Sequence, residues 1–240
     1  MRIGILAHSF SSAFPIFEAV EDSPRREVFI ILSPSPHRSA WTSKLANLAR
    51  LVLLSLKEFN SKPLQLLVTG RLVLLREAFH DKRSVDTLVK LKLDVGLHKA
   101  GVIYRDATIQ AFHLGILNHH IGILPAYRGR SVLEWSILRG DPVGVTVFFI
   151  DTGIDTGSRI LISEQVDISS FQSVAEAKQY LFSLDKVFFR RALSLLDSNA
   201  EFQLNDGSGR RYFVMSKLFS SVVERLLRDN NEVDEPCGLW

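Results

Sequence analysis

The chain has 240 residues, of which 46% are hydrophobic and 23% are charged, and its formal net charge at pH 7 is +3. This is ordinary globular composition, with room for one large domain or for a medium domain and an appendage. Cys237 is the only cysteine, which excludes an intrachain disulfide framework and a zinc site made of several cysteines, so we expect a reducing compartment.

Membrane and nucleic-acid functions are not indicated by the sequence. No uninterrupted apolar run reaches the roughly 20 residues of a membrane span, and the apolar start over residues 1–7 is too short for a signal peptide. Basic residues do not form a long stripe interleaved with stacking aromatics, so a nucleic-acid partner is not expected. We expect a cytoplasmic protein.

Leucines at three- and four-residue intervals over 41–59 predict an amphipathic helix that packs on the core, with a membrane-surface helix as the alternative.

The start of the chain has the pattern of a strand, a helix and a second strand. The apolar run over residues 1–7 predicts a buried first strand, and a polar turn over 8–12 leads into a helix with apolar spacing over 13–20. A second run, rich in isoleucine and valine, covers 26–32 and stops at a Pro/Ser turn. We therefore expect a βαβ unit with a parallel sheet, which binds ligands at the carboxyl ends of its strands.

The rest of the chain continues this alternation. The expected elements are, in order, a helix and a short strand within 86–103, a strand ending at His120, a loop over 122–129, a helix over 131–138, a buried strand over 144–150, a loop over 151–157, a strand over 160–168 and a long helix over 174–196. The predicted fold class is α/β: a Rossmann-like, mostly parallel sheet with helices on both faces, plus a small C-terminal appendage. We expect a main domain over 1–196, a linker over 197–209 with a hairpin turn at Gly207-Ser208-Gly209, and a small tail element over 210–240.

Three polar side chains follow neighbouring predicted strands. Asn118 and His120 are two residues apart in one strand, so their side chains project to the same side, and Asp155 lies in a glycine-flanked loop after the next strand. An amide and an imidazole can stabilise an oxyanion, and a carboxylate can orient the imidazole or accept the proton of an attacking amine. Asn and His near a strand end are also common structural residues, so the spacing alone leaves both interpretations open.

The histidines do not indicate a metal site. The sequence has no HExxH motif and no cysteine cluster, so no metal is expected, although His119, His120 and an aspartate are able in principle to hold one ion. His98 and His113 are interpreted as surface or turn residues rather than ligands.

The most specific signal is a series of motifs in the second half of the chain. Residues 118–129 read Asn-His-His-Ile-Gly-Ile-Leu-Pro-Ala-Tyr-Arg-Gly, and they are followed by Trp135, Gly140, Gly144-Val145-Thr146 and, at 151–157, Asp-Thr-Gly-Ile-Asp-Thr-Gly. These motifs cover about 40 residues in order and resemble the signature of the formyltransferase superfamily, which includes glycinamide ribonucleotide and methionyl-tRNA formyltransferases. A looser likeness extends back to the first strand and forward to the helix ending near Leu196.

This resemblance implies a Rossmann-like catalytic domain that uses 10-formyltetrahydrofolate as cosubstrate and no metal. In this family the residues that match Asn118 and His120 stabilise the oxyanion, and the residue that matches Asp155 positions the histidine and manages the amine's proton. Family pterin pockets use the segment before the catalytic strand and part of the later loop. The cofactor-binding residues expected on this basis are Gly101, Val102, Ile103, Tyr104 and Ile154.

The acceptor implied by the resemblance is a primary amine of a small metabolite. Glycinamide ribonucleotide enzymes have a glycine-rich phosphate loop where this chain has His-Ser-Phe-Ser-Ser at 8–12, and methionyl-tRNA enzymes carry a further domain where fewer than 45 residues follow Leu196. An amino-sugar nucleotide is therefore ranked first, with those two substrates as alternatives. The expected substrate-binding residues are Ser11, Ser12 and Arg128, although Arg128 alternatively pins its loop to a carbonyl.

Two further functions stay open at this point. With water in place of the amine the chain is a 10-formyltetrahydrofolate hydrolase, although such relatives usually carry an extra N-terminal domain. The other alternative is a non-catalytic folate-binding or scaffold module. As for assembly, a homodimer is possible for this chain.

Overall fold

The computed structural model describes residues 1–34 and 62–232, with the side chains up to residue 228. The chain divides into two compact units, Met1–Asn118 and His119–Trp240. Strand β5, Phe112–His120, runs across this boundary. The helix expected over 41–59 lies outside the described residues. Within the described part, no helix combines the length and the apolar character that a membrane crossing requires.

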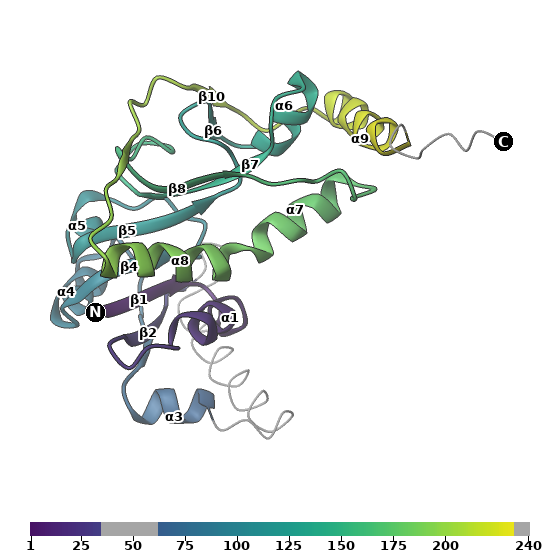
Figure 1. Ribbon diagram of the computed structural model, residues 1–240. Coiled ribbons are helices and arrows are strands. Elements are labelled where there is room, and N and C mark those ends of the chain that lie inside the picture. The colour runs from purple at the N-terminus through teal and green to yellow at the C-terminus, as the bar shows by residue number, and fades with distance from the viewer. Residues whose placement is uncertain (35–61, 233–240) are drawn as a thin grey trace. The chain divides into compact units, whose positions relative to one another are not determined.

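The first unit is built on parallel strands (Figure 1). Its elements before β5 are β1 Arg2–Ala7, α1 Phe10–Val20, β2 Glu27–Leu32, α3 Lys62–Val68, β3 Leu72–Leu74, α4 Lys82–Lys90, β4 Leu93–His98 and α5 Asp106–Ile109. The strand order is β3-β2-β1-β4-β5, and every neighbouring pair is parallel. Because β1 is flanked by β2 on one side and β4 on the other, the order of the strands reverses at β1, where open α/β sheets bind ligands.

The apolar runs of this unit become buried strands because both faces of a parallel sheet are covered. All residues of β1 after Arg2 are buried, as are all residues of β2 after Glu27. Helix α1 packs on both strands and begins at Ser9, whose side chain accepts a hydrogen bond from the Ser12 amide. This N-cap satisfies one of the backbone donors that a helix leaves free at its start.

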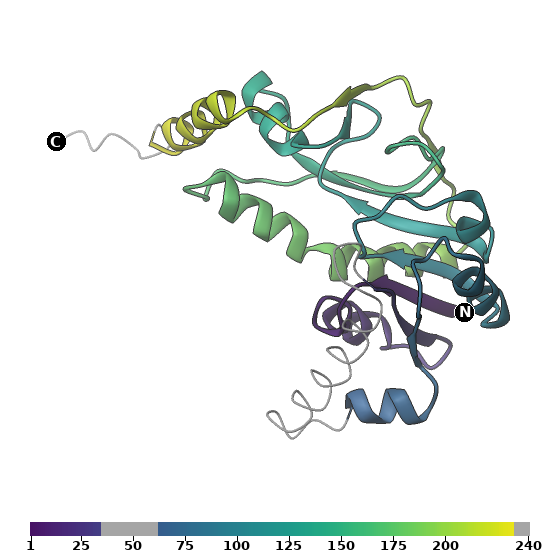
Figure 2. The ribbon, with the colours of Figure 1, turned by 180° about the vertical axis from the view of Figure 1, so that it is seen from behind.

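The second unit combines an antiparallel sheet with a two-stranded ribbon. Its elements after β5 are β6 Tyr127–Gly129, α6 Val132–Arg139, β7 Gly144–Phe149, β8 Arg159–Gln165, α7 Val174–Ser183, α8 Asp185–Asp197, β9 Gln203–Leu204, β10 Arg210–Tyr212 and α9 Lys217–Glu232. Strands β7, β8 and β9 are neighbours in that order and antiparallel, and β10 pairs in parallel with β6. Figure 2, which shows the ribbon from behind, follows the chain from β10 into α9.

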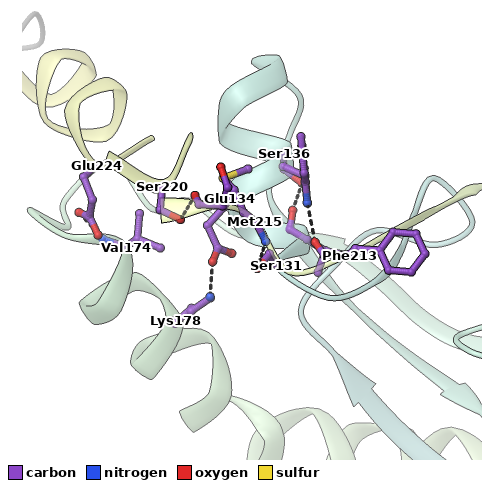
Figure 3. Close-up of polar contacts among 12 residues, drawn as sticks. Ser131, Glu134, Ser136, Val174, Lys178, Phe213, Met215, Ser220 and Glu224 are labelled. Atoms are coloured by element: carbon purple, nitrogen blue, oxygen red, sulfur yellow. Dashed lines mark hydrogen bonds and ion pairs between the residues drawn. The ribbon is translucent and has the colours of Figure 1, made fainter. Parts of the chain in front are cut away.

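The part of the chain after Tyr212 is held on this unit by hydrogen bonds (Figure 3). The Met215 amide donates to Ser131 Oγ at 3.2 Å, and Trp135 Nε1 donates to the Phe213 carbonyl at 3.0 Å. Helix α9 packs on α6 and α7, and its Glu224 accepts a hydrogen bond from the Val174 amide at 3.1 Å. Residues 213–232 are therefore an integrated part of the unit.

The predicted fold class is confirmed: the chain has a Rossmann-like α/β fold with a mostly parallel sheet and packed helices. Some predicted elements differ in detail. The helix expected over 174–196 is two helices, because bonds of the tighter i to i+3 type occur around Leu184. The strand expected over 160–168 ends at Gln165, and the loop over 122–129 contains β6. The turn at 207–209 is not a hairpin turn, because the strands on its two sides pair with different partners, β8 and β6.

Candidate functional site

A buried histidine and a nearby aspartate form the polar centre of the second unit. His120 is the last residue of β5 and only 7% exposed, and it meets the Phe148 ring edge to face. Its Nδ1 lies 3.7 Å from Oδ2 of Asp155. The same carboxylate oxygen accepts a hydrogen bond from the Gly129 amide at 2.8 Å. The structure therefore brings together two of the three residues predicted to be catalytic.

The other ring nitrogen of His120 is occupied by the backbone. Nε2 lies 2.8 Å from the Tyr127 carbonyl oxygen, and because a carbonyl only accepts hydrogen bonds, Nε2 must carry a hydrogen. In the neutral ring Nδ1 is then the bare nitrogen, so a proton gained by the ring is placed on the atom that faces Asp155. Gly122 makes this geometry possible, since a Cβ there would lie 2.8 Å from Nε2 and 2.9 Å from the Tyr127 oxygen.

Asp155 is presented by a tightly bonded loop. Its backbone is in the left-handed region, with φ of 52°, which is uncommon for a residue other than glycine. Asp151 Oδ1 accepts hydrogen bonds from the Gly153 amide at 2.9 Å and from Thr156 Oγ1 at 2.7 Å, and so closes the loop on both sides of Ile154 and Asp155. An unusual conformation that is determined by its surroundings is common at functional sites.

Arg128 makes the carbonyl contacts that its loop-pinning interpretation predicts. Its Nε donates to the Ile154 carbonyl at 3.3 Å, and its Nη1 donates to the carbonyls of Gly207 and Gly209. Arg128 thus connects the loop after β7 to the segment between β9 and β10. Whether it also contacts a substrate anion stays a prediction, as does the folate contact expected for Ile154.

The remaining predicted site residues belong to the first unit. Asn118 is half-buried and precedes His120 by two positions in β5. The residues from Gly101 to Tyr104 follow β4 and lie outside helices and strands; Gly101 has φ of 63°, and Ile103 is 67% exposed. Their roles, and that of Asn118 beside His120, stay predictions.

The two serines after β1 are engaged with the start of α1. Ser12 Oγ donates to the Ser9 carbonyl at 2.9 Å, and Ser9 Oγ donates to Ser12 Oγ at the same distance. Ser11 is exposed. Substrate binding by Ser11 and Ser12 therefore stays a prediction.

Two further histidines, His8 and His98, lie at strand ends of the first unit. His98 ends β4 and is half-buried, not a surface residue, and its Nδ1 lies 2.9 Å from the Tyr104 hydroxyl. Burial, and then the nearby His8 and Lys99, lower the pKa of His98 to about 4. His8 Nδ1 bonds the Ser33 carbonyl at 3.0 Å. His113 is exposed, as expected.

Within residues 1–34 and 62–232, no three His, Cys, Asp or Glu side chains are grouped so that they could hold a metal ion.

The sheet, the buried histidine and the nearby aspartate define a Rossmann-like α/β protein with an enzyme-like polar centre. The sequence profile of the formyl transferase family matches residues 52–193, which is more than half of the chain. The chain belongs to the formyl transferase family.

Individual relatives agree on the family and differ in the acceptor that their names state. A methionyl-tRNA formyltransferase from Chloroflexus aggregans is 38% identical over 120 residues, covering 49% of this chain and 38% of that protein. The match therefore spans well under two thirds of that relative. A sugar N-formyltransferase from Shewanella has the same fold, with a TM-score of 0.61, 16% identity, and coverage of 95% of this chain and 87% of that chain.

A third comparison is with a formyltransferase from Anoxybacillus kamchatkensis. Its structure was solved in complex with UDP-4,6-dideoxy-4-formamido-L-AltNAc and tetrahydrofolate. The TM-score is 0.57 at 16% identity, and the match covers 96% of this chain and 100% of that chain. At this identity the likeness concerns the fold alone.

Proposed function

We propose that this protein transfers a formyl group from 10-formyltetrahydrofolate to a primary amine of a small metabolite. The observation that carries the proposal is the pair of the buried His120 and the half-buried Asp155, oriented by the Tyr127 carbonyl and the Gly129 amide. Membership in the formyl transferase family supports the reaction class. A reducing, cytoplasmic setting is part of the proposal.

The residues of this chain fit the reaction as follows. The folate supplies the formyl group on a nitrogen that becomes the leaving group. As the amine nitrogen attacks the formyl carbon, negative charge develops on the formyl oxygen, which Asn118 and His120 stabilise as hydrogen-bond donors. His120 donates through Nδ1 when the ring is protonated, because its Nε2 hydrogen is already bound to Tyr127. Asp155 stabilises the resulting positive charge on the ring and accepts the proton that the attacking amine loses. The intermediate then collapses: the bond between the formyl carbon and the folate nitrogen breaks, and that nitrogen leaves with a proton.

Folate binding is assigned to the segment after β4 and to Ile154. Ile103 offers an exposed apolar side chain for a planar heterocycle, and Gly101 to Tyr104 lie outside helices and strands, as suits contact through backbone groups. The complex of the Anoxybacillus protein with tetrahydrofolate supports this cosubstrate. No metal is assigned a role.

We rank the amino group of a sugar nucleotide first among acceptors. Compared as structures, the sugar N-formyltransferase from Shewanella is covered over 87% of its chain and a methionyl-tRNA formyltransferase from Clostridium thermocellum over 73%. Methionyl-tRNA is the second candidate, because the sequence relatives carry that name. In this proposal Ser11, Ser12 and Arg128 contact the acceptor.

One incubation tests the proposal and separates the acceptors. The purified protein is mixed with 10-formyltetrahydrofolate and, in separate reactions, with amino-sugar nucleotides, amino acids, glycinamide ribonucleotide or methionyl-tRNA. Mass spectrometry then detects the formyl adduct. We expect an adduct with an amino-sugar nucleotide. A formyl adduct on methionyl-tRNA alone would select the second candidate, and formate release without any acceptor would indicate a hydrolase.

Variants then test the three residues of the reacting centre. Asn118→Ala, His120→Ala and Asp155→Ala should each reduce turnover by at least about 100-fold, while calorimetry still detects binding of the folate. If all three variants transferred the formyl group at the wild-type rate, the proposed catalytic roles of these residues would be wrong. A wild-type chain without affinity for reduced folates would indicate a non-catalytic module.

A further inference from the structure

A short C-terminal segment, Gln203–Tyr212, contacts both loops that orient His120 and Asp155. It includes β9, β10 and the turn between them, all within the second unit. The turn is held from within, since the Asn205 side chain accepts a hydrogen bond from the Gly207 amide at 3.0 Å. The sequence indicated only a polar linker and a tail over these residues.

Asn205 binds the loop that carries Asp155. It is only 5% exposed. Its backbone amide donates to the Ser158 carbonyl at 2.9 Å, and its side-chain Nδ2 donates to the Gly157 carbonyl at 3.0 Å. Gly157 is two residues after Asp155. The Asp155 loop is thus fixed on one side by Asp151 and on the other by Asn205.

The same segment binds the loop that orients His120. Strand β10 pairs with β6, which contains Tyr127 and Gly129. The carbonyls of Gly207 and Gly209 accept hydrogen bonds from Arg128. The chains approach so closely that a Cβ on Gly209 would lie 1.4 Å from the Pro125 carbonyl oxygen. The segment therefore connects the loop that bears the Tyr127 carbonyl and the Gly129 amide to the loop that bears Asp155.

We propose that Asn205 is a positioning residue, through which the C-terminal segment holds the Asp155 carboxylate beside His120. Asn205 supplies a side-chain donor to the Asp155 loop and a side-chain acceptor to the turn whose carbonyls bind Arg128, so its single side chain ties both loops together. The consequence for catalysis rests on the formyl transfer proposed above. A displacement of about 1 Å in a reacting group can reduce a rate about 100-fold.

Two substitutions at one position and one matched control test this role. Asn205→Ala removes both side-chain hydrogen bonds, whereas Asn205→Asp keeps the acceptor for the Gly207 amide and places a second acceptor against the Gly157 carbonyl. The control is Asp206→Ala in the same turn: Asp206 is exposed, and its carboxylate accepts hydrogen bonds from the amide and the hydroxyl of Ser208. Each variant is measured by steady-state kinetics and by amide hydrogen exchange followed by NMR.

The exchange measurement reports on positioning without any turnover. The Gly129 amide, which bonds Asp155, should exchange at least about tenfold faster in both Asn205 variants, because an opened loop releases its hydrogen bond. The Leu124 amide bonds Thr146 Oγ1 within the same unit and serves as the internal reference, with an unchanged rate. The control variant should leave both amides as in the wild type.

The kinetic measurement separates positioning from general loss of structure. We expect kcat to fall by about 10- to 100-fold in the Asn205 variants while KM for 10-formyltetrahydrofolate changes by less than about threefold, since Ile154 is the only assigned folate contact in the displaced loop and the contacts from Gly101 to Tyr104 are not part of it. If Asn205→Ala does not fold, the isosteric Asn205→Asp decides the outcome. Wild-type exchange at Gly129 in a folded Asn205 variant, or equal losses in the Asn205 and Asp206 variants, would overturn the proposal. If the wild type transfers no formyl group, the proposed function fails while the exchange result still decides the role of Asn205.

Discussion

Oδ2 of Asp155 lies 3.7 Å from Nδ1 of His120 and accepts a hydrogen bond from the Gly129 amide at 2.8 Å. The carboxylate is therefore held by a hydrogen bond to the backbone, and its distance from the histidine is that of an ion pair and not of a hydrogen bond. Because an uncharged amide oxygen also accepts a backbone hydrogen bond, the charge of Asp155 can be removed while that bond is kept.

Asp155→Asn separates charge from shape at this position. An asparagine oxygen can still accept the Gly129 hydrogen bond, and asparagine tolerates the left-handed backbone of residue 155. We expect the free energy of unfolding to stay within about 1 kcal/mol of the wild type, whereas kcat falls by about 100-fold or more because the protonated ring loses its counter-charge. Urea unfolding and turnover on the same preparation check both parts. Full activity would show that the negative charge is not used.

Thr146 supports the chain immediately after His120. It is fully buried in β7, its Oγ1 donates to the Gly122 carbonyl at 2.7 Å, and it accepts a hydrogen bond from the Leu124 amide at 3.1 Å. Thr146→Val keeps the shape but leaves two buried backbone groups without their partner, so we expect a loss of about 2 to 4 kcal/mol in stability. Thr146→Ser retains the hydroxyl and should lose only about 1 kcal/mol. Equal urea midpoints for the two variants would contradict this assignment.

Glu134 and Lys178 form an ion pair between α6 and α7 (Figure 3). Glu134 is only 7% exposed, so removal of the lysine leaves a carboxylate that is poorly solvated. Lys178→Met should therefore reduce stability by about 2 to 3 kcal/mol. Adding Glu134→Gln should recover part of that loss, because a neutral amide is less costly to bury than a charge. Denaturant unfolding of the two single variants and the double variant measures the coupling, and purely additive effects would argue against it.

His98 predicts a pH dependence of stability. Its pKa is lowered from 6.5 to about 4, first by burial and then by His8 and Lys99. The unfolded chain therefore binds a proton between about pH 6.5 and pH 4 that the folded chain does not, so stability falls as the pH falls through this range. The contribution is at most roughly 3 kcal/mol. The free energy of unfolding of the wild type should fall more than that of His98→Gln when the pH is lowered from about 7.5 to about 4.5. Parallel curves for the two proteins would contradict the prediction.

The sequence by itself determined the fold class and the order of most elements. The apolar runs in the first unit are short and rich in isoleucine and valine, which favours strands of a covered sheet, and the polar turns between them mark where the chain leaves it. Such local patterns also located His120 at the end of a strand and Asp155 in a loop, because both features depend on neighbouring residues alone.

Tertiary structure decided how these residues are held. The Tyr127 carbonyl selects the hydrogen-bearing nitrogen of His120 only because the loop after β5 folds back on the strand. The Asn205 side chain binds the Asp155 loop across 48 residues of sequence. A polar stretch such as 203–209 carries no periodicity that distinguishes a linker from a structural segment. Its role depends on which backbone carbonyls it meets, and that is fixed only when the second unit packs, since buried polar groups must then find partners.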